Sequence, residues 1–521
     1  MKKLKLLLTV ALFPLFCYPQ INDFKMGSYD LPSVSWGDNY NICELNDSTY
    51  FYWVNYFNPS KNGHSSEYFL LNEQHQIKMK WHLIGNDQIL GFYKLNDSSA
   101  VLLSSHLDKK ENQYKITSHL WKGKKWLKKN KVIKTSSKSF KGKRMILERV
   151  YFEAKPSGNW MFACYLRDKN INGELALSLI NSNNKVITSH QINYKKQRSP
   201  QDVTFDNQNT LYVLEKEYRR KVNFGAEQPA GYPEAQDKYL SNHLFNYKLK
   251  TLVENEWMTD NIKLDAYNVR SLLMDVAEKD DQLILYGFLS EKRKDTDISH
   301  ILLQKRQKQT TLLSDVKPLD IYKQRTIAED YYKYRPEYDT YKGSYSFFIP
   351  RKMIEQEDGT LSFYSEDVCQ YNTKDIVQKH DIKELVRKTY SFYGSIHCMT
   401  YGYKSVEMIL PRFGDFNMQP LKVLNEEDDT YLFFTNFESY DQYTTSYQNA
   451  FNLIKISKKG GVEDKSTLFV TREAHEKGIQ LTSGVFNHNK FIFPEKTYHP
   501  KNNNYQLRMI SFSLKDQNNF R

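Results

Sequence analysis

Cysteine is scarce in this chain, and long apolar runs are missing beyond its N-terminus. There are 5 cysteines among 521 residues, and no two of them stand in a CxxC spacing. No segment after the N-terminus reaches about 18 uninterrupted apolar residues, the length that a transmembrane helix requires. We therefore expect no transmembrane span in the mature chain.

The common catalytic motifs are also missing. The sequence contains no GxSxG, HExxH, P-loop or GxGxxG motif, so no short pattern names a reaction. A catalytic site assembled from distant segments stays open, because such sites are recognised by geometry rather than by spacing. Helical periodicity is equally rare, and only residues 379–388 are expected to form a short helical turn. The scarcity of helical periodicity favours an all-β protein.

The first twenty residues differ from the rest of the chain. Three lysines precede the apolar run 6–16, which is too short to span a bilayer and predicts a secretory signal peptide over residues 1–20. An exported protein is therefore expected, located in the periplasm, at the outer membrane or in the medium. Lipidation at Cys17 is not expected, because Phe16 stands where a lipoprotein signal requires a small residue.

Removal of the signal leaves four cysteines: Cys43, Cys164, Cys369 and Cys398. Four cysteines in an exported chain allow three disulfide pairings, and the spacing selects none of them. Since they lie far apart in sequence, we expect buried thiols rather than a disulfide framework.

A repeat of turn and strand dominates what is present. An Asp, Asn or Gly turn precedes a burst of aromatic and β-branched residues, as at 46–48 before 49–54, and a second strand-like run follows. Most second runs begin 17 to 23 residues after the turn, the length of a strand, a connection and a return strand. The turns recur at intervals of 50 to 77 residues, marked by Asp47, Asp97, Gly158, Gln208, Asp281, Asp358, Asp428 and His488.

This repeat, with an aromatic content of 14% that suits half-buried strands, predicts an all-β fold. Together with the signal peptide, it resembles the blades of exported bacterial β-propellers. The resemblance implies one β-propeller domain over residues 21–521, with seven or eight blades of short antiparallel strands. It is architectural only, because the WD dipeptide, the kelch double-glycine pattern and the sialidase Asp-box are absent.

One loop has the residue order of a calcium-binding loop. Oxygen-bearing side chains alternate at Asp168, Asn170 and Asn172 before a glycine. An EF-hand would place a bidentate glutamate eleven residues after its first ligand, where this chain has Leu179. Asx-Gly turns between strands need no metal. These three residues are the candidate calcium ligands, and no other cofactor is expected.

The connections between the two strands of each repeat should emerge on one face of a propeller. They are rich in tyrosine and arginine, which are common at recognition surfaces, although tyrosine is abundant throughout this chain. The candidate ligand-binding residues are Tyr56, Arg219, Arg220, Tyr232, Tyr440, Tyr443, Tyr447 and Tyr498. The leading prediction is an exported, non-enzymatic propeller that binds a protein partner or an envelope glycan through this face.

An alternative stays open beside it. Carboxylates, or Tyr, His and Arg side chains, that converge on the central channel of a propeller would make the protein a glycan-active enzyme, either a hydrolase or a lyase. The fold alone does not choose between the two functions.

Residues 109–144 contain fourteen Lys or Arg and one acidic residue, with Trp121 and Trp126 between them. Such a segment can attach to an anionic surface. The alternative is a solvated outer hairpin whose tryptophans pack inward. Nucleic acid is not an expected partner of an exported protein. The lysines assigned to an anionic surface are Lys124, Lys125, Lys128 and Lys129.

Overall fold

The computed structural model divides the chain into two compact units. Unit 1 comprises Met1–Asn58, Tyr68–Trp81 and Gln419–Arg521, and unit 2 comprises Pro59–Glu67 and His82–Met418. The structure describes residues 22–24, 30–31, 39–46, 49–58, 63–73, 76–83, 87–108, 113–123, 125–136, 146–167, 173–195, 198–218, 245–291, 298–319, 345–379, 382–402, 406–415, 421–426, 429–441, 446–457, 462–471, 477–479, 485–487, 490–499 and 504–513.

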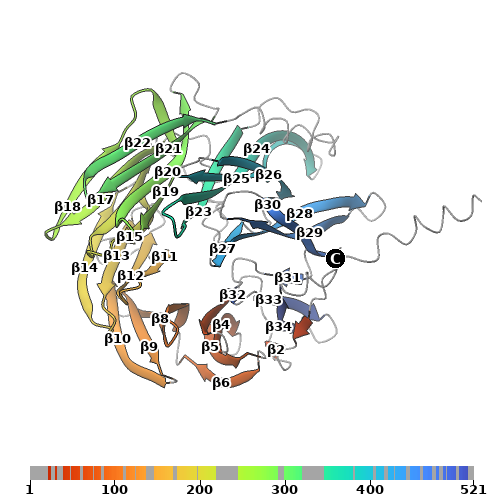
Figure 1. The fold of residues 1–521 in the computed structure, drawn as a ribbon. Coiled ribbons are helices and arrows are strands. Elements are labelled where there is room, and N and C mark those ends of the chain that lie inside the picture. Colours follow the sequence, from red (N-terminus) through yellow and green to blue (C-terminus); the bar gives the residue numbers. More distant parts are fainter. Residues whose placement is uncertain are drawn as a thin grey trace, which may run out of the picture. The chain divides into compact units, whose positions relative to one another are not determined.

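Unit 2 contains five antiparallel sheets of four strands, which follow one another along the chain (Figure 1). The first is β7 (Gln88–Asn96), β8 (Ser99–Asp108), β9 (Gln113–Lys122) and β10 (Lys125–Ser136). The second is β11 (Ile146–Ala154), β12 (Trp160–Arg167), β13 (Gly173–Ile180) and β14 (Val186–Tyr194). The third is β15 (Arg198–Phe205), β16 (Leu211–Tyr218), β17 (Phe245–Val253) and β18 (Glu256–Ile262). The fourth is β19 (Tyr267–Ala277), β20 (Gln282–Glu291), β21 (Ile298–Gln307) and β22 (Thr310–Pro318), and the fifth is β23 (Tyr345–Glu355), β24 (Leu361–Lys379), β25 (Ile382–Tyr401) and β26 (Val406–Asp415).

Two further sheets have the same four-stranded order. One is β3 (Asn39–Asn46), β4 (Thr49–Asn58), β5 (Gly63–Asn72) and β6 (Ile77–His82), and the other is β27 (Lys422–Glu426), β28 (Asp429–Asp441), β29 (Ser446–Ile456) and β30 (Val462–Thr471). A last sheet in unit 1 joins the two ends of the chain, because β1 (Asn22–Phe24) and β2 (Asp30–Leu31) both pair with β34 (Asn504–Ser513). Its other strands are β31 (Lys477–Ile479), β32 (Val485–Asn487) and β33 (Lys490–His499).

The all-β class and the β-propeller architecture predicted from the repeat are confirmed, with seven blades of four antiparallel strands. No described residue lies in a helix, and hence none forms one long and apolar enough to cross a membrane. The short helical turn expected at residues 379–388 is wrong. Lys379 belongs to β24 and residues 382–388 belong to β25, and backbone pairing from Tyr371↔Tyr390 to Lys379↔Ile382 makes these strands an extended antiparallel pair instead.

The turns that mark the repeat join the first strand of a sheet to the second. In unit 2 their side chains cap the hairpins, since Asp206 Oδ1 accepts a hydrogen bond from the Thr210 amide at 2.7 Å and Asp358 Oδ1 accepts one from the Thr360 amide at 2.9 Å. Asn96 Oδ1 accepts one from the Ser98 amide at 3.0 Å. Short polar side chains favour turns for this reason.

The second and third strands of a blade form the core. Every residue of β13 and all but the last residue of β12 are buried, whereas β14, the fourth strand, is largely exposed. Strands covered on both faces read as continuous apolar runs. Neighbouring blades of unit 2 pack through these strands, and Leu214 and Leu249 of one blade meet Leu285 and Leu302 of the next in a single buried cluster.

The first strands of the five blades in unit 2 lie side by side in the order β7, β11, β15, β19 and β23. We call this row the inner edge. Each of these strands shifts register against its second strand, at Ile89/Gly91, Leu147/Arg149, Pro200/Asp202, Val269/Ser271 and Pro350/Lys352. Such β-bulges bend a strand and change the direction of the side chains that follow. The bulges therefore decide which residues face the inner edge.

Candidate active site

A polar row occupies one side of β11 at the inner edge. Arg149, Tyr151, Glu153 and Lys155 alternate along the strand and its end, so they share one face. This face meets β15: the Tyr151 hydroxyl donates a hydrogen bond to the Pro200 carbonyl at 3.2 Å, and Thr204 Oγ1 donates one to Glu153 Oε2 at 2.7 Å. The row thus bridges two consecutive blades.

The Glu153 carboxylate is engaged at both oxygens. Lys155 Nζ lies 2.6 Å from Glu153 Oε1, while Oε2 receives the Thr204 hydroxyl. The Lys155 side chain is only 3% exposed and its ammonium lies 5.5 Å from the centre of the Phe205 ring. Burial raises the pKa of Glu153, Lys155 and Thr204 act in the opposite direction, and the charge of Asp275 adds to the rise. Glu153 is therefore held in one place with a charged partner.

Asp202 follows directly after the bulge of β15 and is half-buried. Its carboxylate accepts hydrogen bonds from the backbone amides of Val203, at 2.9 Å, and Met274. The pKa of Asp202 is nevertheless raised to about 7. Burial is the largest cause of this rise, and the negative charge of Asp275 is the second largest. Glu153 contributes to the same rise. At neutral pH a large fraction of Asp202 therefore carries a proton.

Asp275 places a third carboxylate on the next blade. It is a half-buried residue of β19, and its Oδ1 accepts a hydrogen bond from the Val276 amide at 2.9 Å. Three consecutive first strands thus contribute Glu153, Asp202 and Asp275, and each pair of these groups interacts electrostatically. Among the described residues, no group of three or more His, Cys, Asp or Glu side chains has the geometry of a metal site.

This arrangement provides an acid and a base in one place. A carboxyl group whose pKa lies near 7 can donate a proton at neutral pH, and a second carboxylate nearby can accept one or attack. Tyr151 belongs to the same polar row, and its ring packs against a cluster of buried hydrophobic side chains. Burial raises the pKa of Tyr151 to about 12, so its hydroxyl stays protonated and acts as a hydrogen-bond donor.

The tyrosines predicted to bind a ligand lie in other sheets. The structure places Tyr440 of β28 opposite Tyr447 of β29, and Tyr498 of β33 opposite Tyr505 of β34. Tyr56 lies in β4. Their role in binding stays a prediction, and the same holds for the four assigned residues outside the described part of the chain: Arg219, Arg220, Tyr232 and Tyr443.

The candidate calcium ligands Asp168, Asn170 and Asn172 also lie outside the described residues, so the calcium site stays a prediction. The lysine patch is described in part. Lys125 is exposed at the start of β10, the strand also contains Lys128 and Lys129, and Lys124 falls outside.

The aromatic residues beside the lysines pack inward. Trp121 is 3% exposed, and its ring meets that of Trp126 edge-on at 5.1 Å between centroids. This agrees with the outer-hairpin alternative for the basic segment. The expectation of buried thiols holds for Cys43, Cys164 and Cys398, and Cys164 and Cys398 are in no disulfide. Cys369 lies in β24, and Cys17 lies outside the described residues.

Sequence reasoning missed the inner-edge carboxylates. The alternation of Arg149, Tyr151, Glu153 and Lys155 is a visible signal of a polar strand face. The signal from Asp202 is weaker, because the groups that raise its pKa come from β11 and β19, on the blades before and after its own. No pattern of neighbouring residues in the sequence indicates that groups of β11 and β19 lie close to Asp202.

No protein-family model and no curated protein matches this chain. Among solved structures it is similar to the β-propeller domain of the Trilobed protease from Pyrococcus furiosus, at 8% identity over 87% of this chain and 97% of that one, with a TM-score of 0.35. It is also similar to an acylaminoacyl peptidase from Pyrococcus horikoshii (8% identity, 91% and 58% coverage, TM-score 0.36) and to a puromycin hydrolase (7%, 89% and 59%, 0.37). The chain thus spans little more than half the length of these two enzymes.

At such identities the similarity concerns the fold. The prediction of a non-enzymatic binding protein is corrected, since the neighbours named above come from a protease, a peptidase and a hydrolase. These similarities carry no activity over to this chain, so any chemistry has to be argued from its own residues.

Proposed function

We propose that this protein is a hydrolase that cleaves glycosidic bonds at the inner edge of unit 2. The observation that supports the proposal is the carboxyl group of Asp202, whose pKa of about 7 arises from burial and from the charges of Asp275 and Glu153. Cleavage of a glycosidic bond needs one protonated and one ionised carboxyl group on either side of the bond. We assign the first role to Asp202 and the second to its electrostatic neighbour Asp275.

In this mechanism Asp202 donates its proton to the oxygen that leaves with the departing sugar. Asp275 either removes a proton from the attacking water or attacks the anomeric carbon itself. The Glu153 carboxylate, held in place by Lys155, contributes to the raised pKa that keeps Asp202 protonated. The predicted signal peptide would bring the enzyme to the glycans of the cell envelope.

The substitution Asp202→Asn tests the acid. Hydrolysis of a polysaccharide should fall about 10²- to 10⁴-fold, because the leaving oxygen loses its proton donor. An aryl glycoside whose leaving group needs no proton should be hydrolysed with a much smaller loss. In the wild type, kcat should decline as the pH rises through about 7, where Asp202 ionises.

The matched control is Glu217→Gln, which alters a carboxylate of the same sheet that instead pairs with Arg198 at 2.7 Å and Lys248 at 2.9 Å. It should leave both rates close to those of the wild type. Equal losses for polysaccharide and aryl glycoside in Asp202→Asn would contradict the acid role. Failure to cleave any member of a panel of envelope and plant polysaccharides would contradict the proposed function as a whole.

A further inference from the structure

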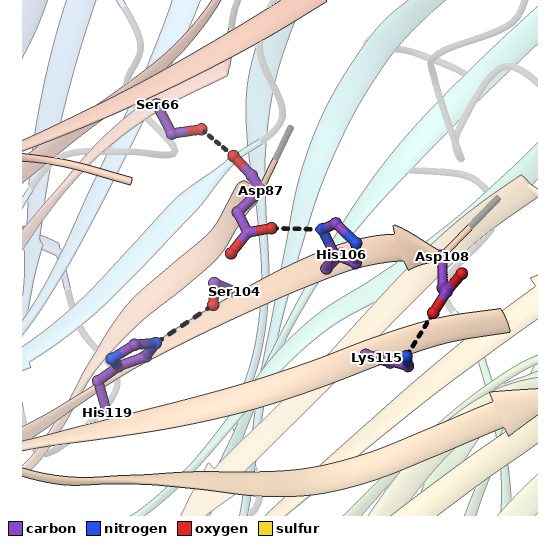
Figure 2. Close-up of polar contacts among 7 residues, drawn as sticks. All are labelled: Ser66, Asp87, Ser104, His106, Asp108, Lys115 and His119. Atoms are coloured by element: carbon purple, nitrogen blue, oxygen red, sulfur yellow. Dashed lines mark hydrogen bonds and ion pairs between the residues drawn. The ribbon is translucent and has the colours of Figure 1, made fainter. Parts of the chain in front are cut away.

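A second polar cluster lies on the first blade of unit 2, outside the candidate active site. Ser104, His106 and Asp108 alternate along β8, so they share one face of the sheet. Lys115 and His119 of β9 add to the same face, with Lys115 directly opposite His106. Figure 2 shows these side chains together with Asp87, which stands just before β7.

Asp87 and His106 form a close pair at the surface. Asp87 Oδ1 lies 2.6 Å from His106 Nδ1, with the carboxylate 20% and the imidazole 46% exposed. The backbone of Asp87 is fixed by Ser66, whose hydroxyl donates a hydrogen bond to the Asp87 carbonyl at 3.0 Å (Figure 2). Ser66 is buried, and its own carbonyl accepts a hydrogen bond from the Leu83 amide at 3.0 Å. These hydrogen bonds fix the backbone of Asp87 and so hold its carboxylate close to the His106 ring.

This contact selects one tautomer of the neutral ring. Because a carboxylate only accepts hydrogen bonds, Nδ1 carries the proton and Nε2 carries the lone pair. Among the described residues Asp87 is the polar partner of His106, and the imidazole is 46% exposed. A carboxylate that orients a histidine in this way leaves the opposite nitrogen ready to take a proton from water.

Lys115 brings positive charge to the same place. Directly opposed residues of an antiparallel pair have Cβ atoms about 5 Å apart, so the Lys115 side chain is a neighbour of the imidazole. Its ammonium is ion-paired with Asp108 and the side chain is 30% exposed. A partly exposed ammonium on the same sheet face as a base can stabilise an oxyanion that forms between them.

We propose that Asp87, His106 and Lys115 form a second catalytic site that hydrolyses carboxylic esters. His106 Nε2 takes a proton from a water molecule while the water oxygen bonds to the ester carbonyl carbon, and the resulting oxyanion lies beside Lys115. When the intermediate collapses, the bond between the carbonyl carbon and the alkoxy oxygen breaks. The leaving alkoxide takes the proton back from His106, so the products are a carboxylic acid and an alcohol.

Esters are the substrate class that this site suits. A neutral imidazole with a carboxylate partner supplies a base, whereas a glycosidic bond requires a proton donor for its leaving oxygen. The proposal does not depend on the glycosidase function, because the two sites share no residue.

The test is the hydrolysis of p-nitrophenyl acetate and p-nitrophenyl butyrate by the full chain. His106→Gln should lower kcat/KM about 10²-fold, and Asp87→Asn should lower it by a similar factor because the ring then loses the partner that holds its tautomer. The matched control is His119→Gln. His119 lies on the same face, and its ring nitrogen contacts Ser104 Oγ at 3.4 Å (Figure 2). This variant should keep the wild-type rate within about twofold.

Equal rates for His106→Gln and His119→Gln would overturn the proposal, since the hydrolysis would then come from scattered imidazoles. Should either substitution at the pair prevent folding, carbethoxylation of the wild-type protein replaces it. Modification of His106, mapped by peptide mass spectrometry, should then proceed in parallel with the loss of esterase activity. Loss of activity without modification of His106 would also overturn the proposal.

Discussion

The carboxyl group of Asp202 shows how neighbouring charges set the chemistry of one residue. Its two hydrogen bonds to backbone amides stabilise the ionised form, yet burial and the charges of Asp275 and Glu153 outweigh them. The same balance has a consequence for stability. A carboxyl group that binds its proton more tightly in the folded chain than in the unfolded chain destabilises the fold when it ionises.

The substitution Asp202→Asn should therefore stabilise the protein in a pH-dependent way. The pKa of Asp202 rises from the ordinary 3.8 to about 7, so the cost of ionisation is absent below pH 3.8, grows between these values and is complete above 7. We expect the variant to exceed the wild type in free energy of unfolding by roughly 1–3 kcal/mol at pH 8, and by little at pH 4. Denaturant titrations at the two pH values measure this. Asp358→Asn, in an exposed turn, is the control, and a difference of the same size at both pH values would contradict the explanation.

The hairpin between the first and second strands is the element that the repeat encodes. In the blade of β15 and β16 the Asp206 carboxylate accepts hydrogen bonds from the Thr210 amide at 2.7 Å and from the Tyr212 hydroxyl at 2.9 Å. Asp206 is 3% exposed and Tyr212 is 1% exposed, so both bonds are shielded from water. Hydrogen bonds also join such turns between blades, as from Asn159 Nδ2 to Asn209 Oδ1 at 3.0 Å.

The buried and exposed turns should respond differently to the loss of their aspartate. Asp206→Ala removes the acceptor of a buried hydroxyl and of a buried amide, and should lower the free energy of unfolding by about 2–4 kcal/mol. Asp358→Ala alters the equivalent turn of the fifth blade of unit 2 at an exposed position, and should cost about 0.5 kcal/mol. Urea denaturation compares the two. Similar losses would show that the markers stabilise the fold by something other than buried hydrogen bonds.

At the scale of the whole molecule, the two chain ends meet in one sheet of unit 1. Residues Asn22–Phe24 pair with Met509–Ser511, and Asp30 and Leu31 pair with Gln506 and Tyr505. The contact links the first and last described strands of the chain. It also covers an edge of β34, whose backbone groups would otherwise be open to other chains.

A chain that begins at residue 32 should be less stable than one that begins at residue 21. The loss of β1 and β2 removes their backbone hydrogen bonds to β34 and should cost about 2–4 kcal/mol, at about 1 kcal/mol for each bond. Thermal unfolding with simultaneous light scattering measures both the midpoint and the aggregation that an open strand edge promotes. Identical unfolding of the two chains would mean that this pairing contributes nothing to stability.

Much of the fold was predictable, and little of the site was. Turns such as those at Asp206 and Asp358 depend on side chains that accept hydrogen bonds from amides two to four residues away. They can therefore be predicted from the local sequence. The hairpin of β24 and β25 was misread because its alternation is weak and its polar residues also suit a helix. The catalytic assignment to Asp202 needed Met274 and Asp275, which stand more than 70 residues further along the chain.

The sequence by itself therefore determined the strands, their hairpin turns and the propeller class, because turn chemistry and the alternation of a strand act between near neighbours in the chain. Tertiary structure decided which first strands lie side by side. That adjacency places Glu153, Asp202 and Asp275 together on three blades. Tertiary structure also brings Ser66 of β5 to the backbone of Asp87, whose carboxylate pairs with His106. Desolvation and electrostatic interaction depend on distance in space, so the chemistry of both sites exists only in the folded chain.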